Sequence, residues 1–538
     1  MPRSDPVVTV DTELGAIELG AIELVFLLLG VAIALTYLAR RLRIADPIVL
    51  LVGGVALGFV PNLPQVELEP DLVFLLFLPP ILFSAAYFTP IRDFKANARP
   101  ILLLAVGLVL FTTVVVGLVV QALVPGIEPA VAFTLGAIVA PPDAVSATAI
   151  FRRLGVQRRI ITILEGESLI NDASSLIAYR TAVAVVATGA FSLLEATELF
   201  VVAGLGGIAV GVIIGAILAR ALSRTGEPVL EIIVTLVAPF TAFVAAETLG
   251  FSGVLATVVA GLITGQRGAR VLSPEARLLG RGAWATTIWV INAFVFMFVG
   301  LQLREILLGL SEYTAAELAW LGLAVALTVI VVRIVWVYPA TYLPRFLFRR
   351  IRERDPYPPP QTVFIVAWAG MRGVVSLAAA LALPADFPQR ELLLYLTFAV
   401  IVATLIGQGL TLPWVVRHLG VADFGDTQDH EEAHARLAAA EAARLRLDEL
   451  EVEYPDHLPL IDQLRAAFDH ESSHVWQHRE EGPNPAEAEL IDHRAIRSAV
   501  LLAEREAVIR LRDDGEINDD TLRRIEQDLD LEALRTGA

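Results

Sequence analysis

The sequence predicts an all-α polytopic membrane protein with about thirteen transmembrane helices, inverted repeats built on broken helices, and a helical cytoplasmic tail. Composition is the first reason: hydrophobic residues make up 56% of the 538 residues and charged residues only 18%. A soluble protein does not need that much apolar material, because most of its surface faces water. Long apolar segments are the second reason, and the position of the net charge is the third.

Thirteen segments are long and apolar enough to be transmembrane helices, each of which needs roughly 20 mostly apolar residues. They lie near residues 22–41, 46–62, 70–90, 99–124, 128–150, 160–188, 194–221, 228–249, 251–267, 283–303, 316–341, 361–384 and 391–417. The short connection at Gly250 makes the eighth and ninth the least separable. We therefore expect an extracytoplasmic segment at 1–21, a transmembrane domain at 22–418 and a cytoplasmic tail at 419–538.

The distribution of charge predicts the orientation. Loops after odd-numbered spans contain twenty-one Lys and Arg residues, whereas loops on the other side contain only Arg304 and Arg390. Cytoplasmic loops carry such an excess of positive charge. The tail from Val421 onward carries the whole net charge of −17. We expect a multi-pass protein of the cell membrane with its N-terminus outside and its C-terminus in the cytoplasm.

Polar residues inside the sixth span form the main candidate site. Ser168, Asn171 and Asp172 follow one another at helical spacing, so they share one face. Their hydroxyl, amide and carboxylate oxygens suit a dehydrated alkali cation. Removal from water favours the protonated form of a carboxylate, which allows Asp172 to exchange a proton for a cation. The alternative is a polar contact between helices, of the kind that Ser and Asn form in membranes.

Two spans carry helix-breaking residues at mid-membrane. Pro141 and Pro142 precede Asp143 in the fifth span, and Gly370 and Gly373 flank Arg372 in the twelfth. Proline removes an amide donor and breaks a helix. Paired interruptions in two halves of a transporter indicate inverted repeats with the site between them. Asp143 is therefore a second candidate, although capping of a half-helix would also explain it.

The other ionisable residues in the spans have less specific roles. Arg372 needs a counter-charge, which Glu167 or Glu165 is placed to provide, and a structural ion pair is the favoured interpretation. Arg180 lies two turns from Asp172 and is expected either to tune that acid or to make a stabilising contact. Arg333 and Glu247 are isolated in their spans and are interpreted as structural.

Four motifs resemble the cation–proton antiporter family that contains bacterial NhaP and the animal sodium–hydrogen exchangers. They are GESLIND at 166–172, LFLPPILFSAAYF at 76–88, FVGLQL at 298–303 and AGMRG at 369–373, and the similarity runs in order over roughly residues 25–418. The resemblance implies an inverted-repeat bundle, usually a homodimer, whose core moves like an elevator against a dimerisation domain.

The resemblance also implies roles for individual residues. Asp172 matches the cation- and proton-binding carboxylate, while Ser168, Asn171 and Asp143 match its partners. Glu167 and Arg372 match a structural ion pair. Asparagine before the aspartate is typical of members expected to be electroneutral.

Two departures from the family pattern affect the ligand set. The chain has Pro142-Asp143-Ala144 where many members have Thr-Asp-Pro, and Ser84 stands where relatives often carry an acid.

The tail contains most of the histidines. His470, His474 and His478 recur at helical spacing. A solvated helix face, a pH sensor and a metal site are all compatible with that spacing, and histidine changes charge between pH 5 and 8. The absence of cysteine excludes disulfides and thiol chemistry.

These observations predict a secondary antiporter that exchanges a monovalent cation for H⁺, and not an enzyme. Na⁺ is the first choice and K⁺ or Li⁺ are alternatives, in a function that serves pH and cation homeostasis. A passive cation channel needs a continuous polar pore, whereas the polar residues here cluster at one depth. An intramembrane aspartate enzyme is the remaining alternative. We expect no cofactor, no resident metal and no nucleic-acid partner.

Overall fold

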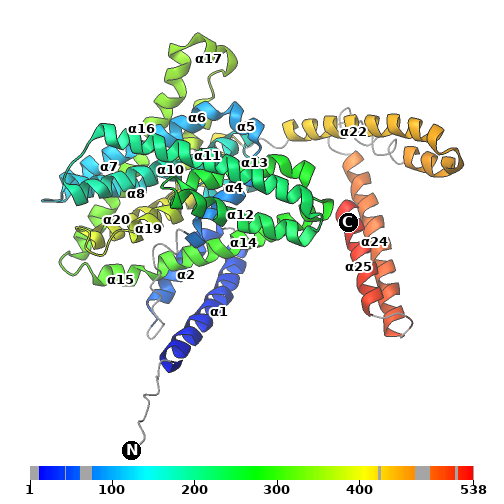
Figure 1. Cartoon of the computed structure of the whole chain (residues 1–538), viewed down its shortest axis with the longest axis horizontal. Helices are drawn as coiled ribbons and strands as arrows, with labels where there is room; N and C mark the ends of the chain where they lie inside the picture. The colour runs from blue at the N-terminus through cyan, green and yellow to red at the C-terminus, as the bar shows by residue number, and fades with distance from the viewer. Residues whose placement is uncertain are drawn as a thin grey trace, which may run out of the picture. The chain divides into compact units, whose positions relative to one another are not determined.

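The computed structural model describes residues 11–42, 44–60, 75–421, 426–466, 485–514, 516 and 519–536. The described residues contain helices and no strands (Figure 1). The chain divides into two compact units, Met1–Phe424 and Gly425–Ala538. The all-helical architecture predicted from the sequence is confirmed.

The first unit contains the apolar helices. Its N-terminal half comprises α1 (Asp11–Leu42), α2 (Asp46–Gly58), α4 (Leu78–Phe88), α5 (Ile91–Ala96), α6 (Ala98–Leu102), the π-helix η1 (Leu103–Leu108), α7 (Val109–Leu123), α8 (Pro129–Val139), α9 (Ala144–Arg153), α10 (Arg158–Thr188) and α11 (Leu193–Thr225). Its C-terminal half comprises α12 (Pro228–Thr248), α13 (Gly253–Val271), α14 (Pro274–Leu301), α15 (Leu303–Leu308), α16 (Ala315–Leu347), α17 (Arg349–Arg354), α18 (Pro360–Trp368), α19 (Val374–Leu381), α20 (Arg390–Val402), the π-helix η2 (Ala403–Gln408) and α21 (Gly409–Leu419).

Eight helical segments of the described residues are long and apolar enough to cross a membrane. They are Glu23–Leu42, Ala98–Leu123, Pro129–Arg153, Leu194–Thr225, Pro228–Thr248, Pro274–Leu308, Ala315–Leu347 and Arg390–Leu419. The other five predicted spans correspond to the short helices α2 and α4, to α10 and α13, and to the broken pair α18–α19. The eighth and ninth spans are separate helices, because Gly250 adopts a left-handed conformation with φ 75° between α12 and α13.

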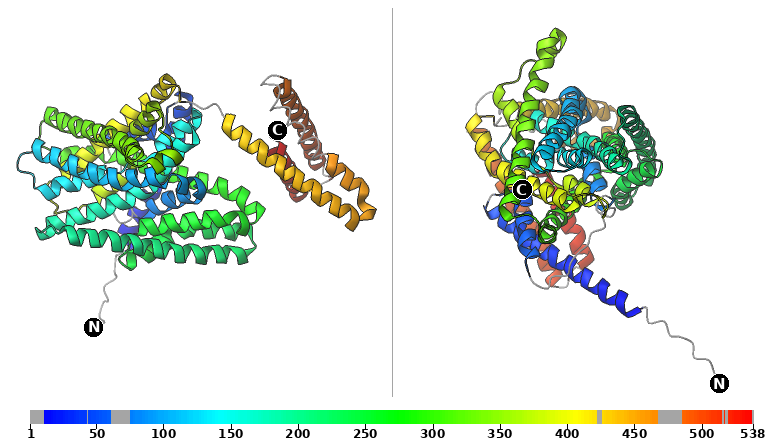
Figure 2. Two further views of the ribbon diagram at one scale, coloured as in Figure 1. Left: turned by 90° about the horizontal axis from the view of Figure 1, so that it is seen from above. Right: turned by 90° about the vertical axis from the view of Figure 1, so that its left-hand side faces the viewer.

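The helices of the first unit form two groups (Figure 1; Figure 2). One group packs α11, α12, α13 and α14 with α2 and α4. The other packs α7, α8 and α10 with α16, α18 and α20. The second group contains two sets of three spans, and the middle span of each set is broken: α8–α9 in the first and α18–α19 in the second. This arrangement brings the two interruptions together.

Small residues allow the helices of the first group to approach closely. A side chain at Gly207 would collide with the backbone of Ser252, which caps α13, and one at Gly211 with the backbone of α13 itself. A side chain at Gly261 or Gly265 would crowd the backbone of α4. Membrane helices pack through such small residues, because lipid supplies no hydrophobic force between them. The glycines therefore make α13 the centre of this group.

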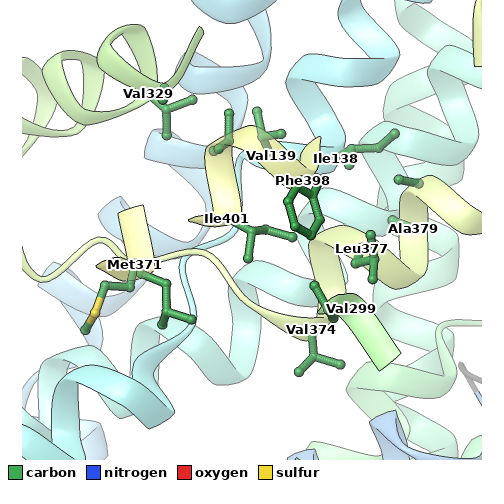
Figure 3. Packing of buried hydrophobic residues seen from close by; sticks show 14 of the residues in the cluster. Ile138, Val139, Val299, Val329, Met371, Val374, Leu377, Ala379, Phe398 and Ile401 are labelled. Carbon is green, nitrogen blue, oxygen red and sulfur yellow. The ribbon is translucent and has the colours of Figure 1, made fainter. Parts of the chain in front are cut away.

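Apolar side chains surround the two interruptions (Figure 3). Ile138 and Val139 of α8, Leu377 of α19 and Phe398 and Ile401 of α20 belong to one buried cluster. Their packing excludes water from one side of the breaks, so polar groups there must find partners within the protein.

The second unit is helical as well. It contains α22 (Asp426–Glu453), the short η3 (Pro455–His457), α24 (Pro485–Asp513) and α25 (Asp519–Thr536), and α24 packs against α25. The predicted histidine cluster, His470, His474 and His478, lies outside the described residues.

Candidate functional site

The two broken helices are joined to each other at their interruptions. The backbone N–H of Asp143 donates to the carbonyl of Met371 at 2.7 Å. The Asp143 carboxylate caps α9, since its Oδ1 accepts from the N–H of Val145 at 2.9 Å. A side chain at Gly373 would collide with this carboxylate. Glycine is therefore required where the second break passes Asp143.

Arg372 binds the carbonyl ends of two half-helices. Its side chain is fully buried and donates to the carbonyl oxygens of Val139 at 3.1 Å and Ala140 at 3.4 Å, and also to that of Gly370. Its backbone N–H donates to Thr404 Oγ1 of η2 at 3.0 Å. The C-terminal end of a helix carries partial negative charge. The guanidinium therefore balances the partial negative charge at the ends of α8 and α18, and not the charge of a carboxylate.

Glu167 forms its ion pair with Arg333 and not with the predicted Arg372. Arg333 donates to Glu167 Oε1 at 2.5 Å and to Oε2 at 2.8 Å, and both side chains are at most 1% exposed. Arg333 also donates to the carbonyl of Val366 near the end of α18, at 3.2 and 3.3 Å. The two-bond geometry is the strongest form of such a pair. The sequence prediction failed because α16, which carries Arg333, packs against α18, whereas Arg372 is already occupied by carbonyls.

Asn171 and Asp172 lie in the middle of α10, beside the first break. The Asn171 amide Nδ2 donates to the carbonyl of Pro142 at 2.9 Å. Its Oδ1 atom is buried and has no hydrogen-bond partner among the described residues. Asp172 is 5% exposed, and no Lys or Arg of the described region forms an ion pair with it. Ser168 is half-buried, one turn before Asp172.

The three other residues singled out near the site in the sequence, Glu165, Arg180 and Ser84, make contacts with groups other than Asp172. Glu165 pairs with Arg152 at 2.7 Å, at the surface. Arg180 pairs with Glu247 of α12 at 2.9 Å, two turns beyond Asp172 and thus about 12 Å along the helix axis. The hydroxyl of Ser84 donates to the carbonyl of Ile81 in its own helix at 3.1 Å. This pair agrees with the structural interpretation of Glu247, whose partner comes from another span.

Sequence reasoning missed the partnership of Arg333 and a cluster around Asp355. The Asp355 carboxylate accepts from Arg99 at 2.5 Å, from Arg345 at 2.6 Å and from Arg159 at 2.7 Å. A cation alone in an apolar span requires a counter-charge, which was the available signal for Arg333. In the described part of the chain no group of three His, Asp or Glu is placed to hold a metal ion.

Comparison with known proteins places this architecture in a family. The family model described as sodium/hydrogen exchanger, transmembrane, matches residues 26–418. A Na⁺/H⁺ exchanger of Mycobacterium tuberculosis is 34% identical over 537 residues, covering 96% of both chains. A sodium, potassium, lithium and rubidium/H⁺ antiporter of Bacillus subtilis is 32% identical over 409 residues, covering 72% of this chain and 61% of the relative.

A solved structure shares the fold. The sodium proton antiporter MjNhaP1 from Methanocaldococcus jannaschii superposes with a TM-score of 0.61 at 20% sequence identity, covering 75% of this chain and 99% of that one. The match over the transmembrane unit agrees with the sequence resemblance. The family model and the antiporter relatives favour an antiporter over the alternatives of a passive channel and an intramembrane enzyme. With its paired broken helices and its buried Asn171-Asp172 step, the chain belongs to the sodium/hydrogen exchanger family.

Proposed function

We propose that Asp172 is the group at which a monovalent cation and a proton compete during exchange. The observation that carries this proposal is a buried carboxylate without a basic partner in the described region, beside the break at Pro142. A buried acid is costly to ionise without compensation. It is therefore neutral with a proton or charged with a bound cation, and each state can be transported.

Asn171, Ser168 and Asp143 complete the proposed binding site. The amide nitrogen of Asn171 is engaged with Pro142, which directs the remaining Oδ1 atom toward other ligands. Ser168 lies on the same face of α10 as Asp172, and Asp143 begins the half-helix at the break. Together these residues offer only oxygen ligands, the type preferred by hard cations.

We assign Arg372 and the Glu167–Arg333 pair to the framework of the site. Arg372 fixes the ends of α8 and α18, and Arg333 ties α16 to α10 and α18. Substitution of these residues is expected to disturb the position of Asp172 rather than to remove a ligand.

The transported cation is proposed to be Na⁺, with K⁺ and Li⁺ as alternatives. The name of the Bacillus subtilis relative, which mentions sodium, potassium, lithium and rubidium, supports keeping all of them in the test. One carboxylate that binds either one cation or one proton supports electroneutral exchange.

The proposal extends to orientation and to assembly, for which the sequence resemblance is the support. We propose a homodimer in the cell membrane, with the N-terminus outside and the acidic tail in the cytoplasm, that contributes to pH and cation homeostasis. The positive-inside pattern of the loops supports this orientation. His470, His474 and His478 are proposed as a pH sensor in the tail. Removal of the chain from Gly425 onward tests this role, and an unchanged pH profile would contradict it.

Transport in proteoliposomes tests the central proposal. With a pH-sensitive dye inside, addition of Na⁺, K⁺ or Li⁺ is expected to collapse a preformed proton gradient. Asp172→Asn is expected to abolish the response, while Glu353→Gln, a surface variant in α17, retains it. An active Asp172→Asn variant, or a wild type inactive with every cation, overturns the proposal. Clamping the membrane potential tests electroneutrality, since a rate that follows the potential contradicts one-for-one exchange.

A further inference from the structure

We propose that a cavity at the beginning of α10 and α18 binds an anionic phospholipid, with an acyl chain in its apolar interior and the phosphate at its arginine-lined mouth. The cavity has a volume of about 260 Å³ and lies between α6–η1, α10, α16 and the segment 356–366. It is separate from Asp172 and its proposed ligands.

Most of the cavity lining is apolar, although Thr341 and Thr362 also line it. Leu104 of η1, Ile160 of α10, Val337 of α16 and Val363 of α18 line it, and all four are buried. An apolar cavity gains little from water and accepts hydrocarbon. A free phosphate would leave this interior unused, so the lining favours a ligand with an alkyl chain.

The mouth of the cavity carries an excess of positive charge. Arg159, which is at the surface, and Arg345, which is buried, both line the cavity and share the single carboxylate of Asp355 with Arg99. Three guanidinium groups face one carboxylate, which leaves two positive charges without a counter-charge in this cluster. The adjacent Arg158 does not change this balance, because it pairs with Asp93 at 3.2 Å.

Two helix N-termini add to the positive potential. α10 begins after Gln157 and α18 after Pro359; both residues line the cavity, and neither side chain caps its helix. Unbonded amide groups at a helix N-terminus attract anions. The proposed orientation places this end at the cytoplasmic leaflet, where anionic lipids are found. Arginines, helix ends and membrane depth therefore favour one ligand, an anionic lipid.

The cavity also touches the framework of the transport site. Val366 lines it, and the carbonyl of Val366 accepts two hydrogen bonds from Arg333, the partner of Glu167. A bound acyl chain would therefore support the end of α18 against which Arg333 is held.

Protection of a single cysteine tests the proposal on the full-length protein in a neutral maltoside detergent. The chain has no cysteine, so Thr362→Cys, which lines the cavity, provides one reactive thiol. Lysophosphatidylglycerol is expected to slow maleimide labelling about tenfold at a concentration ten times its Kd. Lysophosphatidylcholine, which has no net charge, and glycerol 3-phosphate, which has no chain, are expected to give little protection.

Three further variants test the contribution of the charge and that of the cavity separately. Protection is expected to be lost when Arg159→Gln is added and kept when Arg152→Gln is added, because Arg152 pairs with Glu165 outside the cavity. Ala340→Trp, which fills the interior, is expected to abolish thermal stabilisation by lysophosphatidylglycerol. Equal protection by the zwitterionic lipid or by glycerol 3-phosphate overturns the proposal, as does protection that survives Arg159→Gln. If Thr362→Cys does not fold, the thermal measurement on the wild type and Ala340→Trp decides, and equal stabilisation of the two is the contrary result.

Discussion

Glu167 and Arg333 are 166 positions apart in the sequence and form a two-bond ion pair that is closed to solvent. Glu167 lies in α10, little more than one turn before Asp172. The pair joins the helix that carries the proposed exchange carboxylate to α16, and through Val366 to the broken helix α18. The position of Asp172 therefore depends on contacts from the second half of the chain.

Removal of one member of this pair is expected to destabilise the protein strongly. Glu167→Gln leaves the charge of Arg333 buried without compensation, which costs about 3–5 kcal/mol. Thermal unfolding of the purified protein in detergent measures the loss. Two double-mutant cycles compare the arginines, one with Arg333→Met and one with Arg372→Met. The coupling free energy with Glu167→Gln is expected to be large for Arg333→Met and small for Arg372→Met. The reverse order of coupling would contradict the pairing.

Gly373→Ala is expected to lower the transport rate by roughly tenfold or more, because displacement of a site by about 1 Å costs up to a hundredfold. The added methyl group meets the Asp143 carboxylate. Gly407→Ala in η2 is the matched control, since no atom other than those of its own stretch of helix lies within 4 Å of the added carbon. Initial rates of gradient collapse in proteoliposomes compare the two. Equal rates would mean that the position of Asp143 is unimportant for exchange.

The Asp355 cluster is expected to make stability depend on pH. Burial alone would raise the pKa of Asp355, but the hydrogen bonds and charges of Arg159 and Arg345 outweigh burial and hold its pKa below the usual value. Because this pKa is lower in the folded state, Asp355 adds to the free energy of unfolding. The contribution is fully present above the unfolded pKa of about 3.9 and is lost as pH falls through the folded pKa.

Asp355→Asn removes this contribution, so the variant is expected to be about 2 kcal/mol less stable at pH 7 and to converge with the wild type in acid. Unfolding midpoints between pH 3 and pH 7 measure the difference. Asp93→Asn serves as a control, because its pair with Arg158 is half-exposed and contributes less than about 1 kcal/mol. A difference for Asp355→Asn that stays constant across this range would contradict the assignment.

Arg180→Gln is expected to leave the pH optimum of exchange unchanged. Arg180 pairs with Glu247, and the other oxygen of Glu247 accepts from the N–H of Gly253. The charge of Arg180 therefore stabilises the contact between α10 and the end of α12. The half-exposed pair contributes at most about 1 kcal/mol of stability. Its loss can therefore change the rate of exchange by at most about fivefold. Rates measured from pH 6 to pH 9 test this expectation. A shifted optimum would restore the idea that Arg180 acts on Asp172.

The sequence predicted the helices and the depth of the polar residues, but only some of their partners. Apolar segments define spans because lipid penalises every charge, and Pro141, Pro142, Gly370 and Gly373 define the breaks because they cannot continue a helix. The pairing of Glu167 could not be obtained in this way. Helical spacing identifies the face of α10 that carries it, but not which neighbouring helix supplies the cation.

The Asp355 cluster escaped prediction for a related reason. Its arginines lie in α6, α10 and α16, at positions that the sequence assigned to cytoplasmic loops, where orientation in the membrane already explained the abundant positive charge. Only the packing of those helices shows that one carboxylate serves three of them.

The binding of Arg372 to the ends of α8 and α18 has a consequence for ion selectivity. Helix C-termini at a break are places where transporters bind cations, since their carbonyl oxygens are free. Here the protein keeps a tethered cation of its own at that place, held by Val139, Ala140 and Gly370. A second cation would be repelled from these oxygens. We therefore expect the transported ion to bind only side-chain oxygens, those of Asp172 and its proposed ligands, so that discrimination between Na⁺, K⁺ and Li⁺ depends on a few exchangeable residues instead of the backbone.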